Sequence, residues 1–347
     1  MRDVSRRRFL ASTGAVTATG LAGCSGGDNS GGGGGSSGNA SGGGGDGSVS
    51  ILHPEGVPQY ALYEAGLEQG FWQDEGVDLT MDYVPFSRFV QSLSNGEVDV
   101  SVISMIPYMS NYLRGEDVVT FGFSGSLQAI NGLYTRANSD YQSASDMEGR
   151  TVGVWSFGSS TVQSFQAVLA EQTGLQLRED FETTTAAPPA LLGLLTDEEI
   201  DGVVNLSSLT IQMEAEPDTY RQLISLNNAW QQISGSYLPI TSWFASTDWY
   251  DQNTETAAGL LRGARRATQY WRENTQSILN EYGEAAGIDT EAKISVVNEL
   301  ANDGQVFQME PLADSYVEST WQFVELMSES GFIDEVPSQD EILRNPL

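Results

Sequence analysis

Residues 150–161 read Arg-Thr-Val-Gly-Val-Trp-Ser-Phe-Gly-Ser-Ser-Thr, a strand-like run that ends in a turn of glycine and hydroxyl residues. A long helical pattern follows, with Val162, Phe165 and Leu169 on one face. A strand that leads through a short turn into a helix is the repeating unit of α/β folds. We therefore predict an α/β protein.

The same alternation of strand-like and helix-like patterns continues on both sides of this stretch. We predict strands over 77–84, 98–104, 118–125, 132–136, 150–156, 200–206, 220–226 and 237–246, and helices over 61–70, 106–114, 188–195, 255–282, 290–302 and 312–330. A further amphipathic helix is predicted from Phe86, Phe89, Val90 and Leu93, which follow helical spacing. Asn95-Gly96 supplies the C-terminal stop of that helix.

The first 23 residues have the order of an export signal. Ser5–Leu10 carries a twin-arginine motif centred on Arg6 and Arg7, and an apolar run follows that is too short to cross a bilayer. The run ends in Leu-Ala-Gly before Cys24, which is typical of a lipobox. We predict a signal peptide over 1–23, lipid attachment at Cys24, and a flexible Gly/Ser-rich linker over 24–47. The protein would then lie outside the cell membrane, anchored to its outer face.

Composition limits the remaining classes. The chain has 47 acidic and 16 basic residues and a formal net charge of -31, and Lys293 is its only lysine. This balance resembles proteins of extreme halophiles, because molar salt screens the repulsion between so many acids. It also argues against a nucleic-acid partner, which would need a basic surface. Seven Trp, thirteen Tyr and thirteen Phe argue against disorder. With Cys24 as the only cysteine, no internal disulfide can form.

Five short motifs follow one another along the chain. They are Gly-Phe-Trp at 70–72, Glu-Gly-Val-Asp-Leu at 75–79, Gly-Glu-Val-Asp-Val at 96–100, Asp-Met-Glu-Gly-Arg-Thr-Val-Gly-Val at 146–154 and Ile-Asp-Gly-Val at 200–203. The set resembles the substrate-binding proteins of ABC importers in the nitrate, sulfonate, taurine and thiamine-precursor (NMT1/THI5-like) superfamily. The likeness covers about residues 51–226.

The resemblance implies a two-lobed Venus flytrap of the type II periplasmic-binding-protein kind. Lobe 1 would comprise 48–136 plus 237–347, and lobe 2 would comprise 137–236. A small solute would bind between the lobes and close them. The implied partners are the solute and the permease and ATPase subunits of an importer, and we expect a monomer.

In open α/β sheets, ligands bind outside the carboxyl ends of the strands, where helix N-termini favour anions. The residues expected at those ends are Gln59, Tyr60, Phe86, Ser87, Arg88, Ser104, Met105, Trp155, Ser156, Phe157, Gly158, Ser159, Ser160, Thr161, Asn205 and Ser207. Tyr108 and Trp243 are further candidates for the walls of the cleft. The alternatives are a simple helix cap at Ser156–Thr161, a surface role for Arg88 and core packing for the aromatic residues.

Catalysis is not expected, and neither a cofactor nor a metal site is predicted. One branch of the resembling superfamily makes the thiamine pyrimidine with a cofactor-bound Lys and a sacrificial His, but the matching His position here is Gln59. The chain's only histidine, His53, fits a structural role at a strand end. We predict a small anionic or zwitterionic ligand such as a sulfonate, nitrate or taurine. A thiamine precursor or other heterocycle, and an exported enzyme on the same scaffold, remain as alternatives.

Overall fold

The computed structural model describes residues 47–104, 108–109, 112–124, 131–204, 207–238, 241–302, 307 and 310–347. The predicted export motif at Arg6 and Arg7 and the lipidation site at Cys24 lie outside the described residues. So do two predicted ligand-binding residues, Met105 and Asn205. The side chain of Ser207 is likewise not described, although its backbone begins a helix.

Two small sheets form the centre of what we call lobe 1. Strands β1 (Ser48–Pro54) and β2 (Asp78–Val84) pair in parallel. Strand β10 (Thr241–Ser246) lies between β3 (Val100–Ser104) and β4 (Val118–Phe123) and is antiparallel to both. The helices of this lobe are α1 (Gln59–Glu68), α2 (Phe71–Asp74), α3 (Phe86–Ser94), α9 (Thr247–Gln252), α10 (Thr254–Tyr282), α11 (Glu291–Asn302), α12 (Asp314–Glu329) and α13 (Gln339–Ile342).

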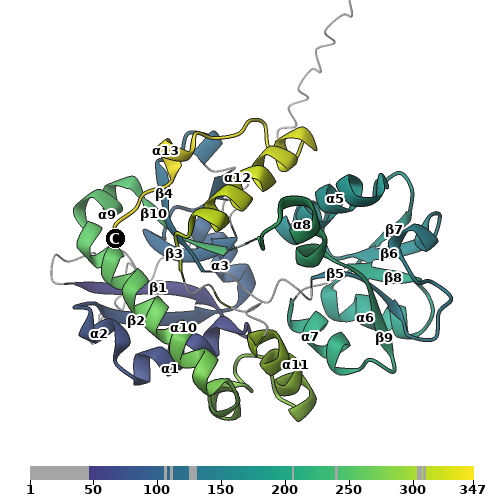
Figure 1. Ribbon diagram of the computed structural model, residues 1–347, viewed down its shortest axis with the longest axis horizontal. Coiled ribbons are helices and arrows are strands. Elements are labelled where there is room, and N and C mark those ends of the chain that lie inside the picture. Colours follow the sequence, from purple (N-terminus) through teal and green to yellow (C-terminus); the bar gives the residue numbers. More distant parts are fainter. Residues whose placement is uncertain are drawn as a thin grey trace, which may run out of the picture. The chain divides into compact units, whose positions relative to one another are not determined.

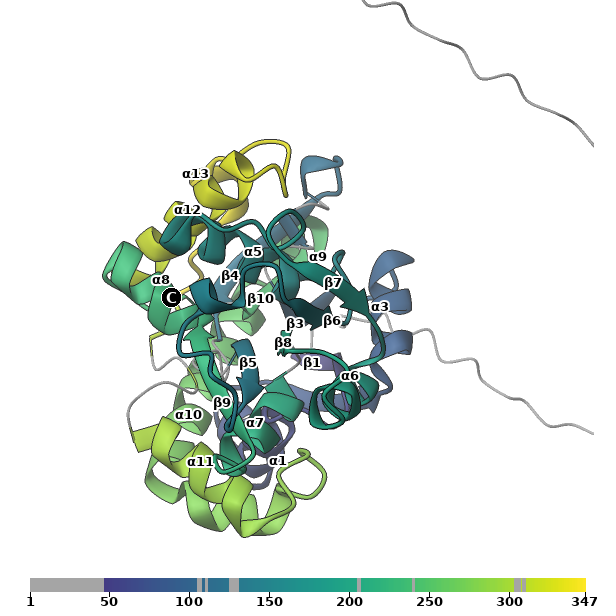
Figure 2. The ribbon, with the colours of Figure 1, turned by 90° about the vertical axis from the view of Figure 1, so that its right-hand side faces the viewer.

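A five-stranded sheet forms the centre of what we call lobe 2. Its strands are, in spatial order, β7 (Glu182–Thr185), β6 (Thr151–Val154), β8 (Gly202–Val204), β5 (Gly132–Arg136) and β9 (Tyr220–Ser225). Its helices are η2 (Ala144–Met147), α5 (Ser160–Thr173), α6 (Pro188–Thr196), α7 (Ser207–Ala215) and α8 (Leu226–Ser234). Helices α5 and α8 cover one face of the sheet, and α6 and α7 cover the other (Figure 1, Figure 2).

Strand β5 requires a correction to the predicted lobe boundary. We expected residues 132–136 in lobe 1, but β5 pairs with β8 and β9 of the five-stranded sheet. The three central residues of β5, which are Leu133, Tyr134 and Thr135, are at most 1% exposed in this sheet. The chain therefore enters lobe 2 before Gly132 rather than after Arg136.

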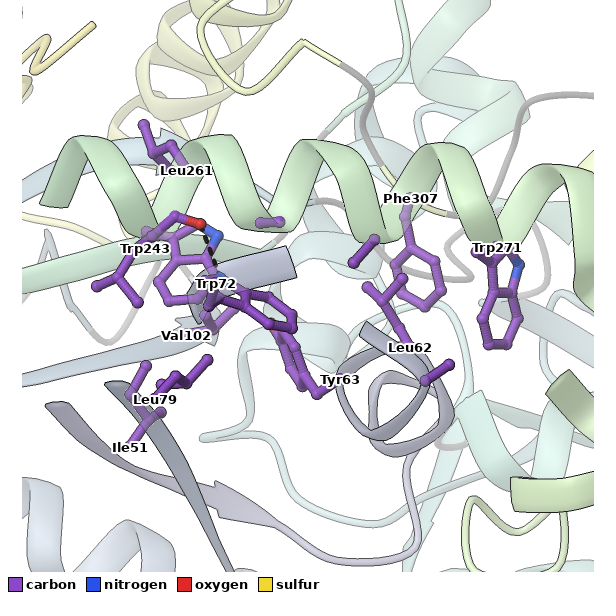
Figure 3. Close-up of a cluster of buried hydrophobic side chains, with 14 of the residues drawn as sticks. Ile51, Leu62, Tyr63, Trp72, Leu79, Val102, Trp243, Leu261, Trp271 and Phe307 are labelled. Atoms are coloured by element: carbon purple, nitrogen blue, oxygen red, sulfur yellow. Dashed lines mark hydrogen bonds between the residues drawn. The ribbon is translucent and has the colours of Figure 1, made fainter. Parts of the chain in front are cut away.

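The largest apolar cluster lies in lobe 1, beneath α10. The indole ring of Trp72 is 1% exposed and its Nε1–H donates to the carbonyl of Leu260 at 3.0 Å, the bond drawn in Figure 3. Gly263 of α10 lies directly over this ring, where a Cβ atom would collide with the indole. The glycine lets α10 approach α2 and α1 closely, so the long C-terminal helix is fixed to the N-terminal elements (Figure 1).

A second cluster joins helices from both lobes. Trp230 of α8 packs edge-on against Phe323 of α12, with ring centroids 5.3 Å apart, and its Nε1–H donates to Ser319 at 2.8 Å. Ala167 and Val168 of α5 belong to the same cluster. One face of α5 thus packs in lobe 2 while the opposite face contacts the C-terminal helix of lobe 1.

Candidate functional site

The carboxyl ends of β1 and β2 lie together in lobe 1. The parallel register pairs His53 with Tyr83, so both strands end at the same edge. Helix α1 begins at Gln59 just after β1, and α3 begins at Phe86 just after β2. These two helix N-termini are therefore neighbours, as expected for the ligand side of an α/β sheet.

An aromatic group surrounds this edge. His53 is 2% exposed, packs edge-on against Tyr63 and Tyr83, and its Nδ1 donates to the Pro54 carbonyl at 3.0 Å. Burial lowers the pKa of His53 to about 4, so the imidazole is neutral at pH 7. Tyr60 lies over Tyr83 with centroids 4.5 Å apart. The only histidine is therefore a packed structural group, while Tyr60 forms part of a two-ring surface.

Tyr83 is held in place by a carboxylate. Its hydroxyl donates to Glu64 Oε1 at 2.8 Å, and burial followed by this hydrogen bond raises the pKa of Tyr83 above its usual range. The ring therefore stays neutral and fixed. Gln59 is the first residue of α1 and is buried, so little of this predicted site residue is accessible from solvent.

Helix α3 presents the exposed part of this region. Phe86 is 52% exposed and Val90, one turn later, is 42% exposed, whereas Phe89 is buried. The predicted apolar face of this helix is thus only half buried. Ser87 and Arg88 are exposed beside these apolar side chains.

Arg88 differs from the other basic side chains. Across the described part of the chain, every other arginine and the lysine makes an ion pair, a hydrogen bond to a carbonyl or a contact over an aromatic ring. No such contact to a described residue is recorded for Arg88. The guanidinium is therefore available to an anion.

In lobe 2, the turn between β6 and α5 is the predicted ligand loop. Ser159 is the N-cap of α5, and its Oγ accepts from the backbone N–H of Val162 at 3.2 Å. Ser156 Oγ accepts from the N–H of Gly158 at 3.2 Å, which shapes the turn. Helix capping therefore explains the position of Ser159, and the hydrogen bond within the turn explains that of Ser156. Ser160 and Thr161 are the first two residues of the helix, and both are half-buried.

One hydrogen bond joins the two halves of the candidate site. Ser104 Oγ, at the carboxyl end of β3, donates to Ser160 Oγ at the N-terminus of α5, at 3.0 Å. Ser104 belongs to a strand of lobe 1 and Ser160 to a helix of lobe 2, and the two were predicted separately as ligand-binding residues. The structure thus brings the strand end of one lobe into direct contact with the ligand loop of the other.

The predicted aromatic walls behave differently from one another. Tyr108 and Trp243 are almost fully buried in the apolar clusters of the protein, so the prediction that they line a cleft is wrong. Phe157 packs against the lobe 2 core, and the guanidinium of Arg178 covers its ring at 3.7 Å. Arg178 therefore covers one face of the Phe157 ring. Trp155 is half-buried directly after β6.

Solved structures with the same architecture define the class of fold. The periplasmic aliphatic sulphonate binding protein SsuA from Escherichia coli aligns with a TM-score of 0.68 and 15% identity, over 87% of this chain and 93% of its own. The alkanesulfonate-binding protein SsuA from Xanthomonas axonopodis pv. citri bound to MOPS gives 0.64 and 12%, over 86% and 98%. The desulfurization enzyme DSZB gives 0.61 and 15%, over 86% and 96%. The chain therefore has the two-lobed α/β fold of type II periplasmic binding proteins, as predicted.

The family follows from the sequence match itself. The model of the NMT1/THI5 like family matches residues 57–278, most of the chain, and the protein belongs to that family. No curated protein matches it. Within the described residues, no helix is both long enough and apolar enough to cross a membrane.

Proposed function

We propose that this protein binds a small anionic or zwitterionic solute outside the cell membrane and delivers it to an ABC importer. The observation that carries the proposal is the Ser104–Ser160 hydrogen bond, which joins the two predicted ligand loops from opposite lobes. A solute held between these loops would contact both lobes at once and would favour their closure.

The chemistry of the site favours an anion. The first turn of α5 offers free backbone N–H groups and the positive end of a 14-residue helix dipole. Arg88, which has no partner in the described part of the chain, adds a guanidinium that can bind an oxyanion in a bidentate manner. None of the candidate ligand-binding residues is acidic, although the chain has 47 acidic residues. These candidate residues therefore offer hydrogen-bond donors and one positive charge to a negatively charged group.

The similar structures support the choice of solute class. Two of them are described as binding sulfonates, which are oxyanions of the kind this site would accept. Membership of the NMT1/THI5 like family agrees with a role in solute binding. Alkanesulfonates and taurine are therefore the first probes.

The N-terminal segment completes the proposed mechanism. We infer that residues 1–23 direct export, that Cys24 carries the lipid, and that residues 24–47 tether the lobes near the permease and ATPase. The division into lobe 1 (48–124 and 237–347) and lobe 2 (132–236) is part of the same proposal. A tether keeps the effective concentration of binding protein near the importer high.

Two other functions have an observation in their favour. The Tyr60–Tyr83 ring pair would suit a planar heterocycle such as a thiamine precursor. The likeness to DSZB shows that the fold is compatible with an enzyme. Catalysis is less well supported here, because His53 is buried and neutral, and Lys293 is paired with Asp289 at 2.7 Å.

The test is a thermal-shift series on the purified protein in molar salt. The probes are butanesulfonate, taurine, nitrate, bicarbonate and a hydroxymethylpyrimidine. A solute at 100 times its Kd should add about 2.7 kcal/mol to the free energy of unfolding. A shift with the pyrimidine alone would favour the heterocycle alternative, and no shift with any probe would contradict solute binding of this kind.

The role of Arg88 is tested in the same series. Arg88→Ala should weaken binding of an anionic probe by about ten- to hundred-fold, the usual value of a charge-assisted hydrogen bond. Arg114→Ala is the matched control, since it removes an exposed arginine of lobe 1 that pairs with Glu116. Equal affinities for wild type and Arg88→Ala would contradict the proposed contact.

A further inference from the structure

Trp155 occupies the junction between the lobe 2 sheet and the ligand loop. It follows Val154, the last residue of β6, and precedes the turn that leads into α5. Strand β6 lies in the interior of the sheet and runs parallel to both of its neighbours, β7 and β8. Its carboxyl end is therefore a position where α/β proteins place ligand-binding residues.

The indole ring lies across the end of the sheet. Trp155 contacts the cluster formed by Val154 and Phe165 on one face and the cluster formed by Leu191 and Val203 on the other. A side chain that packs on both faces at once must span the sheet end. Its orientation is thus fixed by packing on two sides, as a specificity-determining residue requires.

The polar atom of this ring has no hydrogen-bond partner among the described residues. Trp155 Nε1 is shielded from solvent and makes no hydrogen bond to the described residues. By contrast, Trp72, Trp230 and Trp321 donate to acceptors at 3.0, 2.8 and 3.1 Å. Buried indole N–H groups normally find an acceptor, so an unpaired one at a candidate ligand site calls for an explanation.

We propose that the indole N–H of Trp155 donates a hydrogen bond to an oxygen of the bound solute. This inference rests on the proposed solute-binding function and adds a selection rule to it. An indole nitrogen can only donate, so the solute must present an acceptor at this point. An oxyanion or a carbonyl oxygen is accepted there, whereas an ammonium or a methyl group leaves the donor unpaired and is disfavoured.

The test uses Trp155→Phe, which keeps an aromatic ring and removes the N–H. Affinity for butanesulfonate and taurine is measured by calorimetry in molar salt, together with the melting temperature of the free protein. The expected result is an affinity loss of about ten-fold or more, together with a modest fall in the melting temperature of the free protein, because the smaller ring fills less of the packed space. Trp271→Phe is the control, because Trp271 Nε1 is also buried without a hydrogen bond to the described residues, but its ring packs against Phe307 in the lobe 1 core. It should leave affinity unchanged.

A second readout comes from NMR. In protein labelled with ¹⁵N at the indole nitrogens, the resonance that Trp155→Phe deletes should move downfield when the probe is added to wild type. Trp155→Leu, which also lacks a hydrogen-bond donor, replaces the Phe variant if that one does not fold. It should likewise lose affinity for the probes.

The outcomes separate the inference from the function on which it rests. Equal affinities of wild type and Trp155→Phe, or a stationary indole resonance, would overturn the role of Trp155 and leave the binding function intact. A lower melting temperature with unchanged affinity would likewise overturn it, since that is the signature of a purely structural tryptophan. Failure of both probes to bind wild type would instead contradict the proposed anion-binding function.

Discussion

Replacing His53 by glutamine should remove a specific component of the protein's acid sensitivity. The imidazole is 2% exposed between the rings of Tyr63 and Tyr83, and burial lowers its pKa from 6.5 to about 4. The unfolded chain therefore binds a proton between pH 6.5 and pH 4 that the folded protein does not. This difference stabilises the folded state above pH 6.5, and the stabilisation is lost as the pH falls towards 4.

The magnitude follows from the two pKa values. Each unit of difference corresponds to about 1.4 kcal/mol, so the full effect is about 3 kcal/mol between pH 6.5 and pH 4. Since His53 is the only histidine, no other imidazole contributes to this window. The many carboxylates titrate in both proteins and cancel in the difference between wild type and variant.

The assay is urea unfolding at constant molar salt and at pH values from 4 to 7, for wild type and His53→Gln. The free energy of unfolding of wild type should fall more steeply with acidification than that of the variant. Tyr60→Phe, which keeps the histidine, should retain the wild-type slope. A wild-type-minus-variant difference that does not change with pH would refute the account of His53 as a buried neutral group.

Three other substitutions test individual contacts. Ser104→Ala and Ser160→Ala, combined in a double-mutant cycle of unfolding free energies, should give a coupling of about 1 kcal/mol, and zero coupling would contradict the inter-lobe hydrogen bond. Thr320→Val removes a buried hydroxyl that has no partner among the residues the structure describes, and it should leave stability unchanged or raise it by about 1 kcal/mol; a clear loss in the same assay would show that the hydroxyl is paired. Gly263→Ala should cost about 1–3 kcal/mol, because its Cβ would meet the ring of Trp72, and an unaltered melting temperature would contradict this close packing.

Elements with a strong apolar period could be predicted from the sequence. The β6 strand, helix α5 and the long helix α10 all have the predicted type, and β6 and α10 lie close to their predicted bounds. Their apolar residues face a core, so the local pattern and the tertiary packing agree.

Elements whose formation depends on distant contacts were missed. Strand β7 reads Glu-Thr-Thr-Thr and is mostly exposed at the sheet edge, so it has no apolar alternation to reveal it. Helix α8 has Asn227 and Asn228 in its first turn, and asparagine favours turns over helices. The helix is held by the burial of Trp230 against α12. The sequence contains no local sign of that long-range contact.

The candidate site was predicted in part for the same reason. The strand-end rule, which depends only on where strands stop, selected Ser104 and Ser160 separately, and the structure joins their side chains by a hydrogen bond. It could not distinguish aromatic residues that face a core from those at an edge, so Tyr108 and Trp243 were placed wrongly. That Trp155 Nε1 meets no acceptor in the described part of the chain is a property of the packed structure and leaves no pattern in the sequence.

The most direct test of the central claim is calorimetric titration of the purified protein with butanesulfonate and taurine in molar salt. The account predicts saturable binding of at least one of them with a stoichiometry of one solute per chain, weakened by Arg88→Ala and unaffected by Arg114→Ala. Absence of binding by both solutes, or binding to which Arg88 makes no difference, would contradict an anion site between the two ligand loops.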